Sequence, residues 1–140
     1  MAATVSGHIA TTDGQPVAGA MATLWNAERN RKETVYSNAA GQYQLETGFT
    51  GAVQLRARAP MFRDFNIEFE LAADSQENQN LALEALTDVQ EISDSLTASA
   101  HAAALPFPDK DTKNTFISQC SYCHQQGNSL TRRPRSEDDW

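Results

Sequence analysis

Two cysteines and a histidine in the last quarter of the sequence have a spacing that can carry chemistry. The chain holds two cysteines, Cys120 and Cys123, and His124 directly follows the second one. Residues three apart on a helix share one face, so both thiols can reach the two vinyl groups of a single haem. The adjacent imidazole can then ligate the iron. The pattern predicts one covalent haem c, attached through thioether bonds to Cys120 and Cys123, with His124 as the proximal ligand of the iron.

The same residues leave two further chemistries open. A Cys-x-x-Cys pair can cycle between dithiol and disulfide where a helix N-terminus lowers the thiol pKa. The cysteines are expected late in their helix, which argues against this chemistry. A structural zinc ion requires four ligands, whereas Cys120, Cys123 and His124 supply three. Haem attachment with electron transfer is therefore the leading interpretation. The alternative is a non-enzymatic protein-interaction module or subunit in which these residues form a disulfide or a metal site.

Two helices are predicted in the part of the chain that must present this motif. Apolar residues recur at helical spacing over residues 89–104, and Thr87 is the expected N-cap. The Pro-containing segment 105–108 ends this helix. A second helix is expected to begin in the acidic stretch 109–111, which suits a helix N-terminus, and to run to about His124.

Residues 1–84 show the period-2 alternation of half-buried strands, most clearly over residues 65–71. Turn-forming clusters separate the runs, as at residues 13–16. About seven short strands with this spacing predict a mainly β fold, an antiparallel β-sandwich with one buried and one solvent-facing side to each sheet. The expected strands cover residues 5–10, 20–25, 34–37, 42–46, 53–59, 65–71 and 80–83.

No catalytic combination of side chains stands out in the sequence. His8 is expected on the solvent face of its strand, and Arg56 and Arg58 share a solvated face with Gln54. Trp25 is expected to be a packing or edge residue. No carboxylate pair, Ser/His/Asp set or phosphate-binding loop is visible. We therefore expect this chain alone not to be an enzyme.

Composition and charge limit the kinds of partner that this chain can bind. The chain has 140 residues, 40% of them hydrophobic, and a formal charge of −7. An acidic chain without a basic stripe argues against nucleic acid as a partner. Mean hydropathy is −0.53, and no apolar run approaches the roughly 18 residues of a membrane span. The charge favours a redox partner with a basic docking patch and salt-dependent association.

Several strings in the β part resemble the carboxypeptidase regulatory-like family. They are VSGHI at 5–9, DGQPVAGA at 13–20, SNAAGQY at 37–43 and LRARAP at 55–60. The resemblance implies a transthyretin-like β-sandwich, with Gly41 in a turn and Tyr43 in the core. Such modules usually serve interaction or spacing roles beside another function, so the resemblance implies a fold rather than an activity. Met61 departs from the family pattern, which often has glycine before the aromatic residue.

The segment 95–140, with the Cys-x-x-Cys-His pattern, resembles the beginning of a c-type cytochrome domain. It is similar to a group of bacterial periplasmic proteins that join a carboxypeptidase regulatory-like sandwich to such a segment. Some of these proteins continue into a propeller resembling virginiamycin B lyase. The resemblance implies a sandwich over 1–85, a helix and linker over 86–108, and a partial cytochrome c segment over 109–140.

This second resemblance also implies a location and a role. It places an electron-transfer protein in the periplasm or outside the cell, although no secretory signal peptide is visible in the sequence. The chain would be the N-terminal part of a longer protein, which could be an oxidoreductase or a lyase-like enzyme. The sandwich would position the haem segment or dock the redox partner, with further domains or subunits in the same complex.

The distal haem ligand has several candidates. A cytochrome c domain supplies this ligand, often a Met, well downstream of the motif, but sixteen residues follow His124 and none is Met or His. His101 is the best candidate in the chain because it lies on the preceding predicted helix. A partner chain or a further segment of the protein could also supply it. The other candidates in the chain are His8, Met21 and Met61.

The segment 109–140 is short for an independent fold. It has 32 residues, and segments below roughly 40 residues seldom fold without a covalent or metal tie. A covalent haem would provide that tie and much of an apolar core. Four aromatic side chains are expected to pack on the porphyrin, namely Phe107, Phe116, Tyr122 and Trp140.

Overall fold

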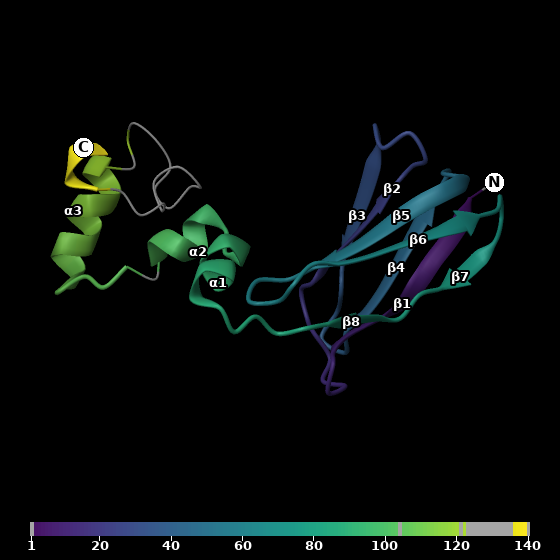
Figure 1. The fold of residues 1–140 in the computed structure, drawn as a ribbon, viewed down its shortest axis with the longest axis horizontal. Helices are drawn as coiled ribbons and strands as arrows, with labels where there is room; N and C mark the ends of the chain where they lie inside the picture. The colour runs from purple at the N-terminus through teal and green to yellow at the C-terminus, as the bar shows by residue number, and fades with distance from the viewer. Residues whose placement is uncertain (1, 104, 121, 123–135, 140) are drawn as a thin grey trace. The chain divides into compact units, whose positions relative to one another are not determined.

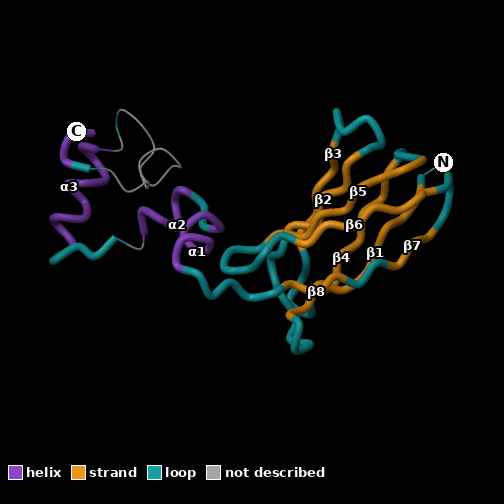
Figure 2. Tube along the Cα trace, viewed as in Figure 1, coloured by secondary structure: helices purple, strands orange, loops and turns teal. Residues whose placement is uncertain are grey.

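The computed structural model describes residues 2–103, 105–120, 122 and 136–139, and the chain divides into two compact units. The first unit, Met1–Thr87, contains all the strands of the described residues, and the second, Asp88–Trp140, contains their helices (Figure 1). Figure 2 shows this separation of strand and helix along the chain. The mainly β fold with few helices that the sequence predicts is confirmed.

The first unit is built from two sheets that face each other. One sheet has the order β4-β1-β7, with β8 also paired to β1, and the other has the order β3-β2-β5-β6. The central strand of the first sheet, β1, lies between β4 and β7 (Figure 1) and also pairs with β8. The strands are β1 (Ala3–Thr11), β2 (Met21–Trp25), β3 (Lys32–Tyr36), β4 (Gln42–Thr47), β5 (Gly51–Arg58), β6 (Phe65–Leu71), β7 (Gln76–Asn78) and β8 (Leu81–Leu83).

The prediction of seven antiparallel strands is wrong in two respects. The described residues contain eight strands, and the additional one, β7, lies in a segment expected to be mostly loop. It has three residues, too few for a period-2 pattern to appear. Both β7 and β8 pair with β1 in parallel, because the chain returns from β6 in the other sheet rather than through a hairpin.

The core fills the space between the inner faces of the two sheets. Register places Val5 opposite Leu45 in the first sheet and Leu24 opposite Leu55 in the second, and all four are buried. Burial of one such side chain contributes about 1.5–3 kcal/mol. The largest fully buried side chains come from both sheets, namely Ile9, Leu24, Leu55, Leu71, Leu81, Leu83, Val5 and Val53.

The predicted turn at Gly41 is confirmed, and it connects β3 to β4. Gly41 has φ +77, and a Cβ at this position would lie 2.4 Å from the carbonyl oxygen of Ile9. The Asn38 carboxamide oxygen accepts hydrogen bonds from the amides of Ala40 and Gln42, both at 3.0 Å. The turn therefore depends on a residue without a side chain at Gly41 and on an Asx-type bond from Asn38.

In the second unit, the single helix expected over residues 89–104 is divided in two. The structure has α1 (Val89–Ser95) and α2 (Ala98–Ala103), followed by α3 (Lys110–Cys120) and a short 3₁₀ turn, η1 (Glu137–Asp139). Leu96 is extended, and the Thr97 hydroxyl then accepts a hydrogen bond from the Ala100 amide at 3.1 Å. Thr97 is thus the N-cap of α2, and the extended backbone at Leu96 separates α2 from α1.

The predicted N-cap at Thr87 is wrong by one residue. Asp88 is the N-cap of α1, since its carboxylate accepts hydrogen bonds from the amides of Gln90 and Glu91, both at 2.9 Å. A carboxylate here also interacts favourably with the helix dipole. None of the helices in the described residues has the length and hydropathy required to cross a membrane.

The backbone at Met61 yields a stability prediction. Met61 has φ 74, in the left-handed region where a Cβ costs about 1–2 kcal/mol. We expect Met61→Gly to have a higher free energy of unfolding than Met61→Ala, by about 1 kcal/mol, because only glycine removes the strain. Both variants lose the same half-exposed side chain, so alanine is the matched control. Denaturant unfolding followed by tryptophan fluorescence measures the difference, and equal midpoints and slopes would contradict it.

Candidate functional site

One member of the predicted haem-attachment motif lies in the described part of the chain. Cys120 is the last residue of α3 and is exposed. Cys123 and His124 lie outside the described residues, so the grouping of the three side chains stays a prediction. The expected start of this helix is confirmed by Lys110, whereas its expected end at His124 falls outside the described residues.

The start of α3 is fixed by a side-chain cap. Asp109 Oδ1 accepts a hydrogen bond from the Thr112 amide at 2.7 Å, and its Oδ2 accepts one from the Thr112 hydroxyl at 2.9 Å. The Thr112 amide and then its hydroxyl hold the pKa of the Asp109 carboxyl below its usual range, because both bonds favour the charged form. The helix that carries Cys120 therefore begins at a defined residue.

The apolar residues of α3 and its neighbours have little protein to pack against in the described part of the chain. No residue of α3 is buried. The Phe107 and Phe116 rings lie 5.1 Å apart, while Ile117 is 51% and Tyr122 is 89% exposed. A helix that buries no side chain gains little from tertiary packing, which is the main source of helix stability in proteins. Its apolar residues are available to another apolar surface.

His101, the predicted distal ligand, already has a hydrogen-bond partner. It lies in α2, half-buried, with Nε2 2.7 Å from the Ser93 hydroxyl of α1. Ligation of iron through Nε2 would require this bond to break. The role of His101 as a distal ligand stays a prediction.

The metal-site alternative also stays a prediction. Among the described residues, no three His, Cys, Asp or Glu side chains gather closely enough to hold a metal ion. The alternative site includes Cys123 and His124, which lie outside these residues.

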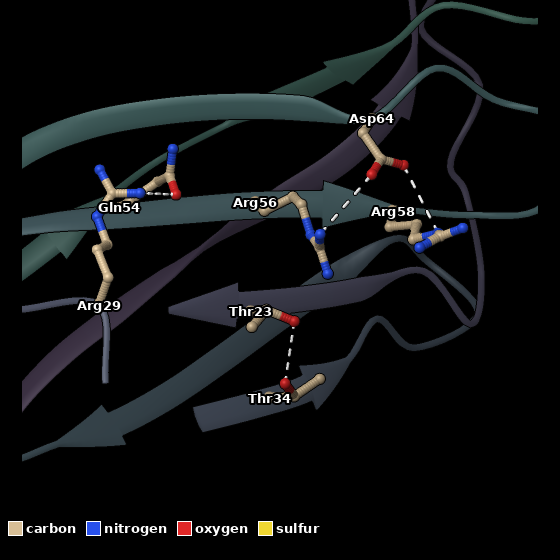
Figure 3. Close-up of polar contacts among 7 residues, drawn as sticks. All are labelled: Thr23, Arg29, Thr34, Gln54, Arg56, Arg58 and Asp64. Atoms are coloured by element: carbon tan, nitrogen blue, oxygen red, sulfur yellow. Dashed lines mark hydrogen bonds and ion pairs between the residues drawn. The ribbon is translucent and has the colours of Figure 1, made fainter. Parts of the chain in front are cut away.

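The outer face of the β3-β2-β5-β6 sheet carries a polar surface that we name the arginine face (Figure 3). Antiparallel register places Arg56 beside Thr23 and Gln54 beside Trp25, so that these side chains share one side of the sheet. The prediction that Arg56 and Arg58 share this side with Gln54 is confirmed. The arginine face comprises Met21, Thr23, Trp25, Lys32, Thr34, Tyr36, Gln54, Arg56 and Arg58, and the outward residues of β6 continue it with Asn66, Glu68 and Glu70.

Two guanidinium groups of this face share a single carboxylate. Arg56 Nη1 lies 3.9 Å and Arg58 Nε 3.7 Å from the Asp64 carboxylate oxygens (Figure 3). These are loose pairs on half-exposed side chains, and such pairs contribute little to stability. Two positive charges against one negative charge leave this part of the face with a local positive excess.

Trp25 and its neighbours form a shallow depression at the other end of the face. The Lys32 ammonium lies 5.0 Å from the centroid of the Trp25 ring, a cation–π distance. Arg29 hydrogen-bonds Gln54 (Figure 3) and pairs with Glu68. The depression has a volume of about 290 Å³. Trp25 is half-exposed at the end of β2, which is an interior strand of its sheet, so the expected edge position is not found.

A second, larger hollow lies mainly on the first sheet, bordered by Tyr36 at the end of β3 and by Asn38 in the following turn, and we name it the amide groove. It has a volume of about 520 Å³. Its floor includes Ser6 and His8 of β1, which lie opposite Gln44 and Gln42 of β4. The groove comprises Ser6, His8, Tyr36, Asn38, Gln42, Gln44, Asn78 and Asn80, with Gly7 and Tyr43 beneath them.

The groove is bordered by a break between β7 and β8 over Gly7. A Cβ on Gly7 would lie 2.0 Å from the carbonyl oxygen of Gln79, so this close approach requires glycine. The Gln79 amide donates to the Ser6 carbonyl at 2.8 Å, and the Asn80 carboxamide oxygen accepts from the His8 amide at 3.0 Å. The Asn80 side chain thereby takes the place of a backbone carbonyl where the pairing with β1 is interrupted between β7 and β8. This hydrogen bond holds the side chain at the wall of the groove.

Sequence reasoning placed His8 correctly on a solvent face but missed the groove. The available signal was the density of amides at alternate positions, Gln42 and Gln44 on one strand and Asn78 and Asn80 near another. That these pairs flank β1 follows from the parallel pairing of β7, which the sequence did not reveal.

The fold and these surfaces define a β-sandwich module with two polar outer faces. The model of the carboxypeptidase regulatory-like domain matches residues 4–84, more than half of the chain. The chain therefore belongs to the carboxypeptidase regulatory-like domain family, as the sequence resemblance implied. Among curated protein sequences, none matches it significantly.

Solved structures share the fold at very low sequence identity. Hydroxyquinol 1,2-dioxygenase from Pseudomonas putida DLL-E4 superposes with a TM-score of 0.51 and 10% identity, over 61% of this chain and 57% of its own. Catechol 1,2-dioxygenase from Acinetobacter radioresistens gives 0.51 and 12%, over 62% and 53%. Chlorocatechol 1,2-dioxygenase from Pseudomonas putida gives 0.51 and 9%, over 59% and 60%. The chain spans little more than half of their length, and the likeness shows the fold alone.

Tyr43, beneath the groove, yields a pH prediction. Its hydroxyl donates to the Gln79 carbonyl at 2.7 Å, and burial raises the pKa of Tyr43 well above its usual value. The neutral phenol is favoured in the fold, so its contribution is complete below about pH 10, the unfolded pKa, and declines as pH rises toward the folded pKa. We expect Tyr43→Phe to lower the free energy of unfolding by about 1–2 kcal/mol at pH 7.

Unfolding in denaturant between pH 7 and pH 11 tests this assignment. The wild-type chain should lose stability above about pH 10, and Tyr43→Phe should lose less. Tyr36→Phe is the matched control, because Tyr36 is 66% exposed and should retain the wild-type profile. Parallel profiles for wild type and Tyr43→Phe would show that Tyr43 is not the group responsible.

Proposed function

We propose that the β-sandwich is a non-catalytic accessory module that docks a partner protein through the arginine face. The observation that carries this proposal is the composition of that face, which combines Trp25 and Met21 with Arg56 and Arg58 on the solvent side of a sheet. Aromatic residues, Met and Arg are enriched at the centres of protein–protein interfaces, and Trp and Arg dominate binding hot spots.

The state of the charges on this face also supports docking. Arg56 and Arg58 make only loose pairs with Asp64, so their donors can turn to a partner at little cost. Arg binds carboxylates in a planar, bidentate geometry. The module would therefore bind an acidic segment of its partner, although the chain as a whole carries a charge of −7. Association should weaken as salt concentration rises.

A site-specific photo-crosslinker tests this docking function in cells of the source organism. We expect a discrete adduct with one partner protein when the crosslinking amino acid replaces Thr34, an exposed residue of the arginine face. Arg56→Ala with Arg58→Ala should reduce the adduct about tenfold or more, as expected for hot-spot residues. The matched control is the same crosslinker at Glu46, an exposed position of β4 in the other sheet.

Equal adducts from Thr34 and Glu46, or an adduct that survives the double arginine variant, would contradict docking through this face. Circular dichroism of each purified variant shows whether a loss of adduct reflects a loss of fold.

A second function is proposed for the helical segment: covalent attachment of haem c and one-electron transfer in the periplasm or outside the cell. Two observations favour it, namely the Cys-x-x-Cys-His pattern of residues 120–124 and the exposed apolar side chains around α3. Cys120 is exposed at the end of α3, which suits a thiol that must react with a large planar cofactor. Phe107, Phe116 and Tyr122 would supply apolar contacts to a porphyrin.

The chain's own residues would hold the group in defined ways. The thiols of Cys120 and Cys123 would hold the group through two thioether bonds, one to each vinyl group, with each thiol hydrogen passing to the other vinyl carbon. The His124 imidazole would be the proximal ligand of the iron. The bound group would supply a reversible one-electron couple. The overall negative charge would favour a redox partner with a basic patch at this segment.

Expression in a host that matures c-type cytochromes tests the haem proposal. We expect a Soret band and sharp α and β bands after reduction, with haem that stays bound in denaturing gels. Cys120→Ser should keep one thioether and shift the reduced α band to longer wavelength, because one vinyl group stays conjugated. Ser118→Ala, on the same exposed helix, is the matched control and should keep the wild-type spectrum.

A featureless spectrum from fully matured protein would overturn the haem proposal. Zinc in a metal assay of that material would then support the metal alternative, whereas a mass loss of two hydrogens would support a disulfide between Cys120 and Cys123.

A further inference from the structure

We propose that the amide groove of the first sheet is a binding site for an uncharged oligosaccharide. Most of the site lies on the opposite sheet from the arginine face, and Tyr36 at the end of β3 borders it from the arginine-face sheet. The inference goes beyond the docking and haem functions without resting on either. It stands on the charge, the hydrogen-bonding capacity and the exposed aromatic ring of the groove.

The groove contrasts with the rest of the surface in its charge. None of the described residues that line it is Asp, Glu, Lys or Arg, although charged residues make up 21% of the chain. The arginine face, by comparison, carries Arg56, Arg58 and Lys32. A charged ligand would lose hydration in the groove without gaining a counter-charge. The lining therefore selects for a neutral, polar ligand.

The side chains on the floor have hydrogen-bonding capacity in reserve. Hydrogen bonds among the described residues do not engage the side chains of Ser6, His8, Gln44 and Asn78. Each carboxamide offers two donors and an acceptor in one plane. A sugar hydroxyl both donates and accepts, so neighbouring hydroxyls match such amides. A neutral ligand rich in hydroxyl groups satisfies this set without requiring any charge.

Strand register arranges these groups as a regular array. Ser6 lies between Gln44 of β4 and Asn78 of β7, and one repeat further along β1, His8 lies beside Gln42. The rows are about 7 Å apart along the strand and the strands are about 4.8 Å apart. This array offers hydrogen bonds over the area of one to two sugar rings. It is built on a sheet, so binding requires little ordering of the protein.

Tyr36 adds an apolar surface to this polar array. Its ring is 66% exposed and lines the groove at the end of β3. The C–H side of a pyranose ring can pack against an aromatic face while its hydroxyls point to the floor. The exposed Tyr36 ring would thus contact the apolar C–H side of the sugar whose hydroxyl groups bind the amides.

Other occupants fit this groove less well. Protein interfaces have buried apolar or Arg anchors at their centre, and the groove has amides there. Nucleic acid requires Lys or Arg for its phosphates, which the lining lacks. Small apolar ligands prefer predominantly hydrophobic pockets. The combination of amides, hydroxyl, imidazole and one exposed ring favours a neutral glycan.

Titration of the full-length ¹⁵N-labelled chain with hexasaccharides tests the site. The probes are cellohexaose, xylohexaose, mannohexaose and maltohexaose, with hexagalacturonate as an anionic control of equal length. We expect at least one neutral probe to shift backbone signals of β1 and β4 and the side-chain amide signals of Gln44 and Asn78. The expected Kd is on the order of 1 mM for an open groove of this size.

Two groove variants and one matched control complete the test. Tyr36→Ala should raise the Kd about fivefold, and Gln44→Ala with Asn78→Ala about tenfold. Gln54→Ala with Asn66→Ala removes two amides from the outer face of the other sheet and should leave the Kd unchanged. All replaced groove residues are exposed, and well-dispersed amide spectra will show that the variants fold.

The proposal is overturned if no neutral probe shifts groove signals at 10 mM, or if hexagalacturonate binds as tightly as the neutral probes. It is also overturned if the groove variants bind like the wild type. A crosslinked protein partner at Gln44 would assign the groove to protein docking instead. The crosslinking result at Thr34 is a separate measurement, so this site and the docking face can fail independently.

Discussion

The sandwich depends on the contact that Gly7 permits between the middle of β1 and the chain between β7 and β8. Because Gly7 has no side chain, the Gln79 carbonyl approaches the β1 backbone, and the Tyr43 hydroxyl then hydrogen-bonds that carbonyl at 2.7 Å. The same contact lets β1 pair with β4 on one side and with β7 and β8 on the other. Any larger residue at this position would force apart the strands on which the first sheet is built.

The two sheets share one core but present different chemistry to solvent. The alternation of side chains along a strand fixes which residues point outward. Because these residues do not pack in the core, the core does not determine their types. On the second sheet those positions hold Arg56, Arg58 and Trp25, whereas around the groove of the first sheet they hold hydroxyl, imidazole and amide groups. Burial therefore explains the fold, and only the outward positions carry information about ligands. The charged arginine face and the uncharged amide groove therefore favour two different partners.

Much of the sandwich could be predicted because its signals are local. Alternation over residues 65–71 and the turn at Gly41 each depend on neighbours in sequence, and both are found in the structure. The β7 strand has three residues and pairs through a crossover between sheets, so no local pattern marks it. The amide groove depends on that pairing, since it brings Asn78 beside Ser6. The break at Thr97 was missed because an alanine-rich stripe hides a competing side-chain cap.

The two units gain stability from different sources, and this difference bears on function. Tyr43, Leu24 and Leu55 bury their side chains within the sandwich, which thus holds its surfaces rigid without outside help. By contrast, α3 buries no side chain, and the Asp109 cap and the Phe107–Phe116 ring pair are among the contacts that support it. A short helix of this kind is marginal in water. An apolar group tied covalently at Cys120 would stabilise it by removing exposed Ile117 or Tyr122 surface from water, so in this segment attachment of the cofactor and folding would be one process.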